Sequence, residues 1–141
     1  MTLYDTIGGE DVLRAILRDF YDRVFVDPMI GYMFHGRDKA HLVEREVEFT
    51  ARLLGADVVY QGRSMAKAHR QHHIARGHFA RRLVLLEQTL DDHQVDESVR
   101  QCWIDHTRAL ASVVMGPSAS ADDCDPPASA EMPMGLKVYK P

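Results

Sequence analysis

The chain has 141 residues, of which 45% are hydrophobic and 27% charged, and its formal net charge is −4 at pH 7. These values are typical of one soluble globular domain and exclude a basic nucleic-acid-binding surface. Cys102 and Cys124 are too few for a disulfide framework or a zinc cluster. The sequence shows neither a signal peptide nor a long apolar run, so we expect a cytoplasmic protein without membrane insertion.

Two helices are predicted before Pro28. Thr2 and Asp5 resemble a capping box, which favours a short helix from Leu3 that ends at the glycine pair 8–9. The next helix is expected over 10–26, because apolar residues recur at the spacing of one buried helical face. These residues are Val12, Leu13, Ile16, Leu17, Phe20, Tyr21, Val24 and Phe25.

A third helix is predicted from Asp38, which can cap it, to Leu54, with Gly55 at its end. Its inward face is expected to carry Leu42, Glu46, Phe49 and Leu53, with Arg45 at the edge. A loop over 56–63 should follow, and then a short turn that ends near His69.

Two last helices are predicted, over 76–92 and 96–115. The first is expected to bury Phe79, Leu83, Leu86 and Leu90, and the second Val99, Trp103, His106, Leu110 and Val113. Arginines gather over 76–82 and alternate with apolar residues, which predicts a helix surface. No strand pattern is present, so the fold class is all-α.

The last segment of the chain, 117–141, contains five of the six prolines, with Ser, Ala and Asp between them. Such a composition buries little surface and favours a flexible tail. We therefore divide the chain into a domain over 1–116 and a proline-rich tail over 117–141.

Histidines are numerous, with eight in the chain, and the densest group is His69, His72, His73 and His78. A structural zinc site would require four converging ligands, and no cysteine lies near these histidines. A di-iron bundle would require Glu-x-x-His pairs, which the sequence lacks. A haem requires one histidine, a large apolar slot and cations for its propionates. His69 precedes an apolar helix that contains Phe79 and is therefore a candidate haem ligand, but its spacing alone does not identify a haem site.

Two stretches of the sequence carry a family resemblance. LYDTIGGEDVLRAILRDFYDRVFVDPMIGYMF, which ends at Phe34, resembles the opening of a group 1 truncated haemoglobin. LLGADVVYQGRSMAKAHRQHHIARGHF, which ends at Phe79, resembles the family's second conserved run, in which Met-x-x-x-His ends at His69. The resemblance covers residues 3–114 and implies a truncated globin, a two-over-two helical sandwich that binds haem b.

The resemblance also implies roles for individual residues. His69 becomes the proximal iron ligand, and the hydroxyl of Tyr21 faces the ligand of the haem. Phe34 stacks near the haem edge, and Leu42 takes the place of the distal histidine of longer globins. Arg45 lies where a cation often meets a propionate. Phe49 and Phe79 complete the apolar walls.

The chain departs from the family at two positions. Ala56 replaces the second glycine of the usual Leu-Gly-Gly, and Glu46 stands where the group commonly has glutamine. An amide both donates and accepts hydrogen bonds, whereas an ionised carboxylate only accepts. If Glu46 is buried, its pKa should rise, and a protonated carboxyl could donate to a ligand or act as a general acid. Alternatively, Glu46 bends out to solvent or pairs with Arg45.

Several functions are therefore compatible with the sequence. The first is reversible binding or transport of dioxygen, nitric oxide or carbon monoxide, which includes nitric oxide dioxygenation with a reductase as partner. The second is a peroxidase-like or nitrite-reducing enzyme that uses Tyr21 and Glu46. The third is a haem- or redox-responsive interaction module that acts through the tail and Cys124. The resemblance is compatible with a monomer or a weak dimer.

Overall fold

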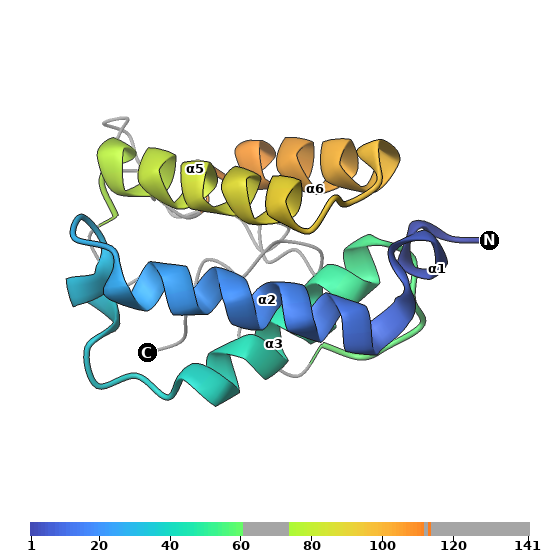
Figure 1. Ribbon diagram of the computed structural model, residues 1–141, viewed down its shortest axis with the longest axis horizontal. Coiled ribbons are helices and arrows are strands. Elements are labelled where there is room, and N and C mark those ends of the chain that lie inside the picture. Colours follow the sequence, from blue (N-terminus) through green and yellow to red (C-terminus); the bar gives the residue numbers. More distant parts are fainter. Residues whose placement is uncertain (61–73, 112, 114–141) are drawn as a thin grey trace.

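The computed structural model describes residues 1–60, 74–111 and 113, and this part of the chain is helical without a strand. Its elements, in chain order, are α1 (Leu3–Ile7), α2 (Gly9–Val26), the 3-10 helix η1 (Gly31–Phe34), α3 (Lys39–Leu53), α5 (Arg76–Asp92) and α6 (Glu97–Ala109) (Figure 1). The all-α prediction is confirmed. His69, His72 and His73, the loop residues 61–63 and the tail over 117–141 lie outside the described residues.

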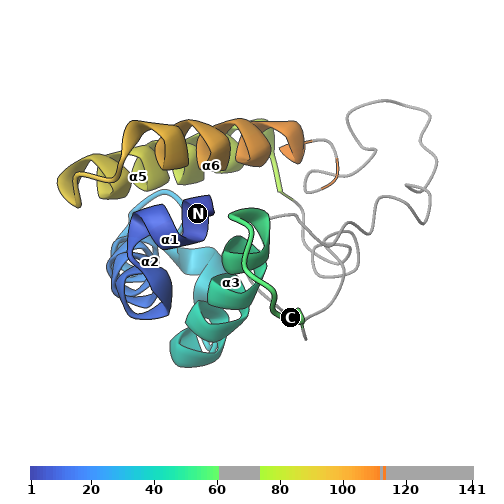
Figure 2. The ribbon, with the colours of Figure 1, turned by 90° about the vertical axis from the view of Figure 1, so that its right-hand side faces the viewer.

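The helices form two layers. Helices α2 and α3 make one layer, and α5 and α6 make the other, as both views show (Figures 1 and 2). The apolar faces of the helices meet between the layers in one core cluster. This arrangement is the two-over-two sandwich that the sequence predicts. No helix in the described part of the chain is long and apolar enough to cross a membrane.

The short helix α1 begins and ends as predicted. The Thr2 hydroxyl accepts a hydrogen bond from the Asp5 amide, and the Asp5 side chain accepts one from the Thr2 amide, so the capping box is present. Gly8 ends the helix at φ 112°, where a side chain would be strained and its Cβ would lie 2.8 Å from Val12 Cγ2. The Tyr4 amide donates to the Leu54 carbonyl at 2.9 Å, which ties α1 to the end of α3.

Helices α2 and α3 bury most of the predicted residues. On α2, Val12 is an exception because it is 42% exposed, and Phe25 is half-buried. On α3, Asp38 caps the first turn by accepting from the His41 amide, as predicted. Leu42, Glu46 and Phe49 are buried and Leu53 is half-buried; Val43, Val47, Thr50 and Ala51 are buried as well.

The buried face of α5 is rotated from the prediction. Leu86 and Leu90 are buried as expected, but Phe79 and Leu83 are only partly buried. The buried face also contains Arg82, Leu85 and Thr89. The prediction of a surface role for the whole 76–82 segment is thus wrong for Arg82. Its position repeats at i+3, i+4, i+7 and i+8 with the other buried residues, so helical geometry places it inward despite its charge.

Helix α6 buries Val99 and Trp103 as predicted, and Leu110 follows the helix as a buried residue. His106 and Val113 are only half-buried, contrary to the prediction, while Ile104 and Thr107 are buried. The helix begins after Asp96, whose side chain accepts from the Ser98 amide, and it ends at Ala109. The predicted end at Met115 lies outside the described residues.

The corner between α2 and η1 is held by one buried carboxylate. Asp27 Oδ2 accepts from the amides of Met29 and Ile30 at 3.0 and 3.1 Å. Asp27 Oδ1 accepts from Nε and Nη2 of Arg81 at 2.9 and 2.7 Å. A Cβ at Gly31 would lie 2.7 Å from the Phe25 carbonyl oxygen, so the chain can turn this tightly only with glycine. The corner thus fixes where η1 delivers Phe34 to the core.

Candidate functional site

Two predicted site residues meet in the core. Tyr21 on α2 and Glu46 on α3 are both 0% exposed. The Tyr21 hydroxyl donates a hydrogen bond to Glu46 Oε1 at 3.0 Å. Glu46 therefore points inward, as the inward face of α3 predicts, and the alternative in which it bends out to solvent is wrong.

A third residue, Arg82, lies beside them, although the sequence predicted it at the surface. Arg82 on α5 is 4% exposed, and its Nη2 lies 3.6 Å from Glu46 Oε2. Its guanidinium carbon lies 4.8 Å from the centre of the Phe20 ring, within the range of a cation–π contact. The buried cluster Tyr21–Glu46–Arg82 thus joins α2, α3 and α5 across the two layers.

The protonation of Tyr21 follows from its surroundings. Burial raises the pKa of Tyr21 well above its usual value, and the negative charge of Glu46 raises it further. The positive charge of Arg82 acts in the opposite direction but does not reverse the shift. Tyr21 therefore remains protonated at neutral pH and acts as a hydrogen-bond donor.

Apolar side chains surround this cluster. Phe34, Leu42 and Phe49 are 2%, 3% and 1% exposed and belong to the same core cluster as Tyr21. The rings of Tyr21 and Phe34 lie 6.3 Å apart in an edge arrangement, and the rings of Phe49 and Tyr60 lie 4.7 Å apart. The structure thus brings three of the predicted apolar wall residues together, while Phe79 lies at the margin of the core.

Arg45 lies at the edge of the inward face of α3, as predicted. Its Nη2 contacts Glu48 Oε2 at 3.1 Å, and the arginine side chain is 17% exposed. Its Nε atom is buried and has no hydrogen-bond partner within the described part of the chain. The side chain is thus placed to offer a donor that its own helix does not satisfy.

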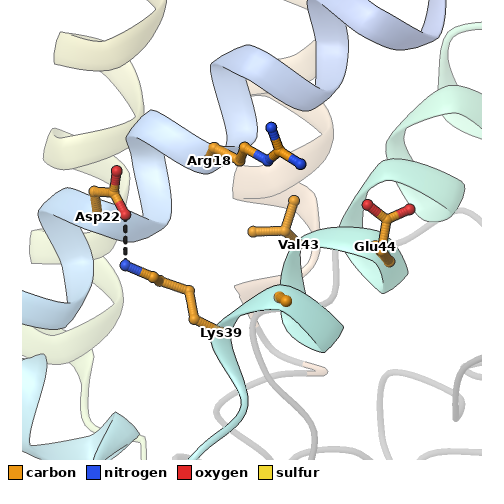
Figure 3. A pocket seen from close by; sticks show the side chains of 6 residues that line it. Arg18, Asp22, Lys39, Val43 and Glu44 are labelled. Carbon is orange, nitrogen blue, oxygen red and sulfur yellow. Dashed lines mark hydrogen bonds and ion pairs between the residues drawn. The ribbon is translucent and has the colours of Figure 1, made fainter.

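A separate pocket lies between α2 and α3 and contains none of the predicted site residues. It is lined by Arg18, Asp22, Lys39, Ala40, Val43 and Glu44 (Figure 3). The Lys39 ammonium contacts Asp22 at 2.6 Å across its mouth. The pocket is not lined by aromatic side chains, so it lacks the walls that a large flat ligand needs.

A two-layer helical sandwich with a buried tyrosine and apolar walls defines the class of the truncated globins. The comparisons with known proteins agree: the family of bacterial-like globins matches residues 2–115. A group 1 truncated haemoglobin from Tetrahymena pyriformis is 30% identical over 110 residues, which cover 76% of this chain and 91% of that protein. The chain belongs to the bacterial-like globins and, within them, to the group 1 truncated haemoglobins, a family of haem proteins.

Solved structures support the same fold. A crystal structure of the Tetrahymena pyriformis truncated haemoglobin, in the Fe(III) form of a tyrosine-to-phenylalanine variant, has a TM-score of 0.75 and 25% identity, and the match covers 82% of this chain and 99% of that one. The 2/2 haemoglobin of Synechococcus, solved with covalently attached haem, has a TM-score of 0.69 and 22% identity over 82% of this chain and 98% of that one. The latter likeness concerns the fold alone.

The described residues fit a haem. A flat and mostly apolar group with two carboxylates needs apolar walls, few inner polar groups and a cation at its edge. Leu42, Phe34 and Phe49 would supply such walls, and Nε of Arg45, which has no hydrogen-bond partner among the described residues, would supply the donor at the edge. Thr50 Oγ1 is a further buried polar atom without a hydrogen-bond partner among the described residues.

Proposed function

We propose that this protein binds haem b through His69 and takes up dioxygen, nitric oxide or carbon monoxide. The observation that carries the proposal is the buried hydrogen bond between Tyr21 and Glu46, set among apolar side chains in a truncated globin. The hydrogen bond satisfies both polar groups without solvent, so a protonated phenol and a carboxyl group stay inside an otherwise apolar core, where a bound ligand can meet them. The proposal of a haem rests on membership of the family, and the proposal of a ligand-binding site beside the iron rests on this polar pair.

Each predicted residue has a role in this proposal. His69 ligates the iron, and Phe34, Leu42, Phe49 and Phe79 contact the porphyrin. Arg45 binds a propionate through its Nε donor, which has no hydrogen-bond partner within the described part of the chain. Bound haem supplies an iron that takes up a diatomic ligand and exchanges one electron. Tyr21 and Glu46 supply the polar groups that such a ligand meets.

The relatives support the placement of this polar pair. The Tetrahymena pyriformis protein has been solved with its tyrosine changed to phenylalanine and with a glutamine changed to glutamate. This glutamine lies 25 positions after that tyrosine, as Glu46 lies after Tyr21, whereas a second glutamine that was also changed to glutamate lies 21 positions after it, as Leu42 does. We infer that Glu46 occupies the place of that glutamine, so this chain carries naturally the carboxylate that was introduced there by mutation.

Haem binding through His69 is tested by adding haemin to the purified chain and recording absorption spectra, oxidised and reduced. We expect a sharp Soret band and a five-coordinate reduced spectrum in the wild type, and loss or gross change of both in His69→Ala. The variants His72→Ala and His73→Ala are matched controls from the same segment and should keep the wild-type spectra. A chain that takes up no haem specifically would overturn the proposal.

Glu46→Gln tests the role of the carboxylate in ligand binding. We expect a higher affinity for dioxygen, of several-fold, because an amide can donate a hydrogen bond to a ligand and an ionised carboxylate cannot. Oxygen equilibrium curves of the haem-loaded protein measure the affinity, with Glu44→Gln, at a partly exposed residue of α3 that pairs with Arg14, as the control. An unchanged affinity would show that Glu46 does not face the ligand.

A second candidate function is favoured by the complete burial of Glu46 beside Tyr21. A buried carboxylate is suited to proton exchange in peroxide or nitrite reduction. Nitric oxide dioxygenation belongs with the first candidate and requires a reductase as a partner. Peroxide or nitrite turnover that is lost in Glu46→Gln, while haem binding persists, would favour the second candidate.

A further inference from the structure

The most unexpected residue of the core is Arg82. Arginine is almost never fully buried unless it is paired, yet Arg82 is 4% exposed on the inner face of α5. Nε and Nη2 of Arg82 have no hydrogen-bond partner among the described residues. Within the described part of the chain, the guanidinium is thus held in the core by its ion pair with Glu46 and by the face of the Phe20 ring, 4.8 Å away, rather than by a full set of hydrogen bonds.

The two oxygens of Glu46 have different neighbours. Oε1 accepts the hydrogen bond of Tyr21 at 3.0 Å, and Oε2 faces the guanidinium of Arg82 at 3.6 Å. The phenol and the cation approach the carboxyl group from different helices, α2 and α5. The carboxyl plane is therefore fixed from both ends, and its orientation depends on residues outside α3.

The protonation state of Glu46 decides what the cluster can do. Burial alone favours the neutral acid, while a nearby cation favours the carboxylate. A neutral acid can donate a hydrogen bond to a neighbour, whereas a carboxylate only accepts one, here from Tyr21. The cation beside Oε2 therefore controls the direction of the hydrogen bond between Tyr21 and Glu46.

We propose that Arg82 is the positioning residue of this site. It holds Glu46 as an oriented carboxylate, so that the Tyr21 hydroxyl donates its hydrogen bond to Glu46. The consequence for ligands rests on the proposed function. At neutral pH, Glu46 then accepts a hydrogen bond and does not donate one, and a ligand meets a phenol whose hydroxyl hydrogen is already engaged with Glu46.

The pH response of the cluster is predictable from its members. Tyr21 on α2, Tyr60 after α3 and Arg82 on α5 face Glu46, while Arg45 and Glu48 lie near it on its own helix. Burial and nearby carboxylates raise the pKa of both tyrosines, so neither phenol titrates between pH 5 and 8. Among the described groups that face Glu46, its own carboxyl is therefore the one to which we assign a pH effect that depends on Arg82 in this range.

The experiment compares the thermal unfolding midpoints of the wild-type chain and of the Arg82→Met variant at pH 5 and pH 8. Without the cation, the pKa of Glu46 in the folded state should lie above its unfolded value. Stability is then kept in acid and lost as the pH rises. We expect Arg82→Met to lower the midpoint by on the order of 10 °C at pH 8 and by clearly less at pH 5.

Further variants separate charge from packing. Arg82→Lys should restore the wild-type pH profile, because it keeps the charge, although the point charge fits less well. The double variant Glu46→Gln with Arg82→Met should be more stable at pH 8 than Arg82→Met alone, because no carboxylate is left unpaired. Arg108→Met, an exposed arginine paired with Glu87, is the matched control and should change the midpoint little at either pH.

A spectroscopic measurement reads the proton directly. The infrared carbonyl band of a protonated carboxyl should be present at pH 7 in Arg82→Met and absent in the wild type, and Glu46→Gln should remove it from the Arg82→Met background. The proposal is overturned if the wild type shows this band. It is also overturned if Arg82→Met loses as much stability at pH 5 as at pH 8. If Arg82→Met does not fold, a folded double variant supports the proposal and an unfolded one overturns it.

These outcomes are separate from the test of haem binding. A chain that takes up haem through His69 but shows no pH-dependent effect of Arg82→Met keeps the proposed function and loses this inference. A chain with the expected stability profile but no specific haem uptake keeps the Arg82–Glu46 pairing and loses the function.

Discussion

Two buried carboxylates of this globin are each matched by an arginine of α5, and the two arginines are adjacent in sequence. Asp27, at the corner after α2, accepts from Arg81 at 2.7 and 2.9 Å. Glu46, between the layers, lies 3.6 Å from Arg82. The side chain of Arg81 is 31% exposed and that of Arg82 is 5% exposed. One pair is short and reaches solvent, and the other is longer and enclosed.

The difference lies in how each carboxylate is satisfied. Both oxygens of Asp27 accept close hydrogen bonds, from two backbone amides and from the guanidinium, and these donors lower its pKa. Its geometry serves the backbone turn. Glu46 is held by the phenol of Tyr21 and by Arg82, whose Nε and Nη2 donors have no hydrogen-bond partner among the described residues. The first pair stabilises a corner of the backbone, and the second orients a carboxylate inside the core, where we propose that a ligand binds.

The largest effect is expected from the corner carboxylate. Asp27→Ala should lower the free energy of unfolding by about 3 kcal/mol, because it leaves the amides of Met29 and Ile30 without their acceptor. Urea unfolding of the purified chain measures the loss. Asp22→Ala, an exposed carboxylate on the same helix, is the control and should cost much less. Equal losses in the two variants would contradict a structural role for Asp27.

Lowering the pH gives a second test of the contribution of Asp27 to stability. The pKa of Asp27 is lowered in the folded state, so its contribution is present above the unfolded pKa and is lost as the pH falls through the folded pKa. The gap in stability between the wild type and Asp27→Ala should therefore narrow below about pH 4.

A smaller effect is expected in the enclosed cluster. Tyr21→Phe should lower the free energy of unfolding by about 1.5 kcal/mol, because Glu46 loses one charge-assisted hydrogen bond but keeps Arg82. Chemical unfolding measures it, with Tyr32→Phe as the control at a tyrosine that is 60% exposed. A loss larger than that of Asp27→Ala would reverse the ranking of the two carboxylates.

Periodicity and capping chemistry predicted most of the fold. The capping box of Thr2 and Asp5, the cap at Asp38 and the inward face of α3 were all accessible from the sequence. These features depend on neighbours within one helix, where local geometry decides. The burial of Glu46 was predictable for the same reason, since Leu42 and Phe49 share its face.

The partner of Glu46 was not predicted, because charge was given more weight than position. Arg82 lies in a basic segment, and its charge favoured a surface assignment. The helical spacing of Arg82 with Leu85, Leu86 and Leu90 places it inward and could have identified it. What no spacing reveals is that α5 faces α3 across the core at the level of Glu46. That pairing is a property of the assembled layers.

The adjacent arginines of α5 have a consequence for how the helix is set in the molecule. Successive residues of an α-helix are rotated by about 100°, so the two side chains leave α5 toward different partners. Only one rotational setting of α5 gives Asp27 and Glu46 a cation at the same time. A single-residue insertion between Leu83 and Val84 would keep this setting at the arginines and rotate Leu86 and Leu90 by about 100° away from the core. Arg81 and Arg82 together thus fix the rotation of α5 about its axis, and this rotation determines which residues of the helix face the core.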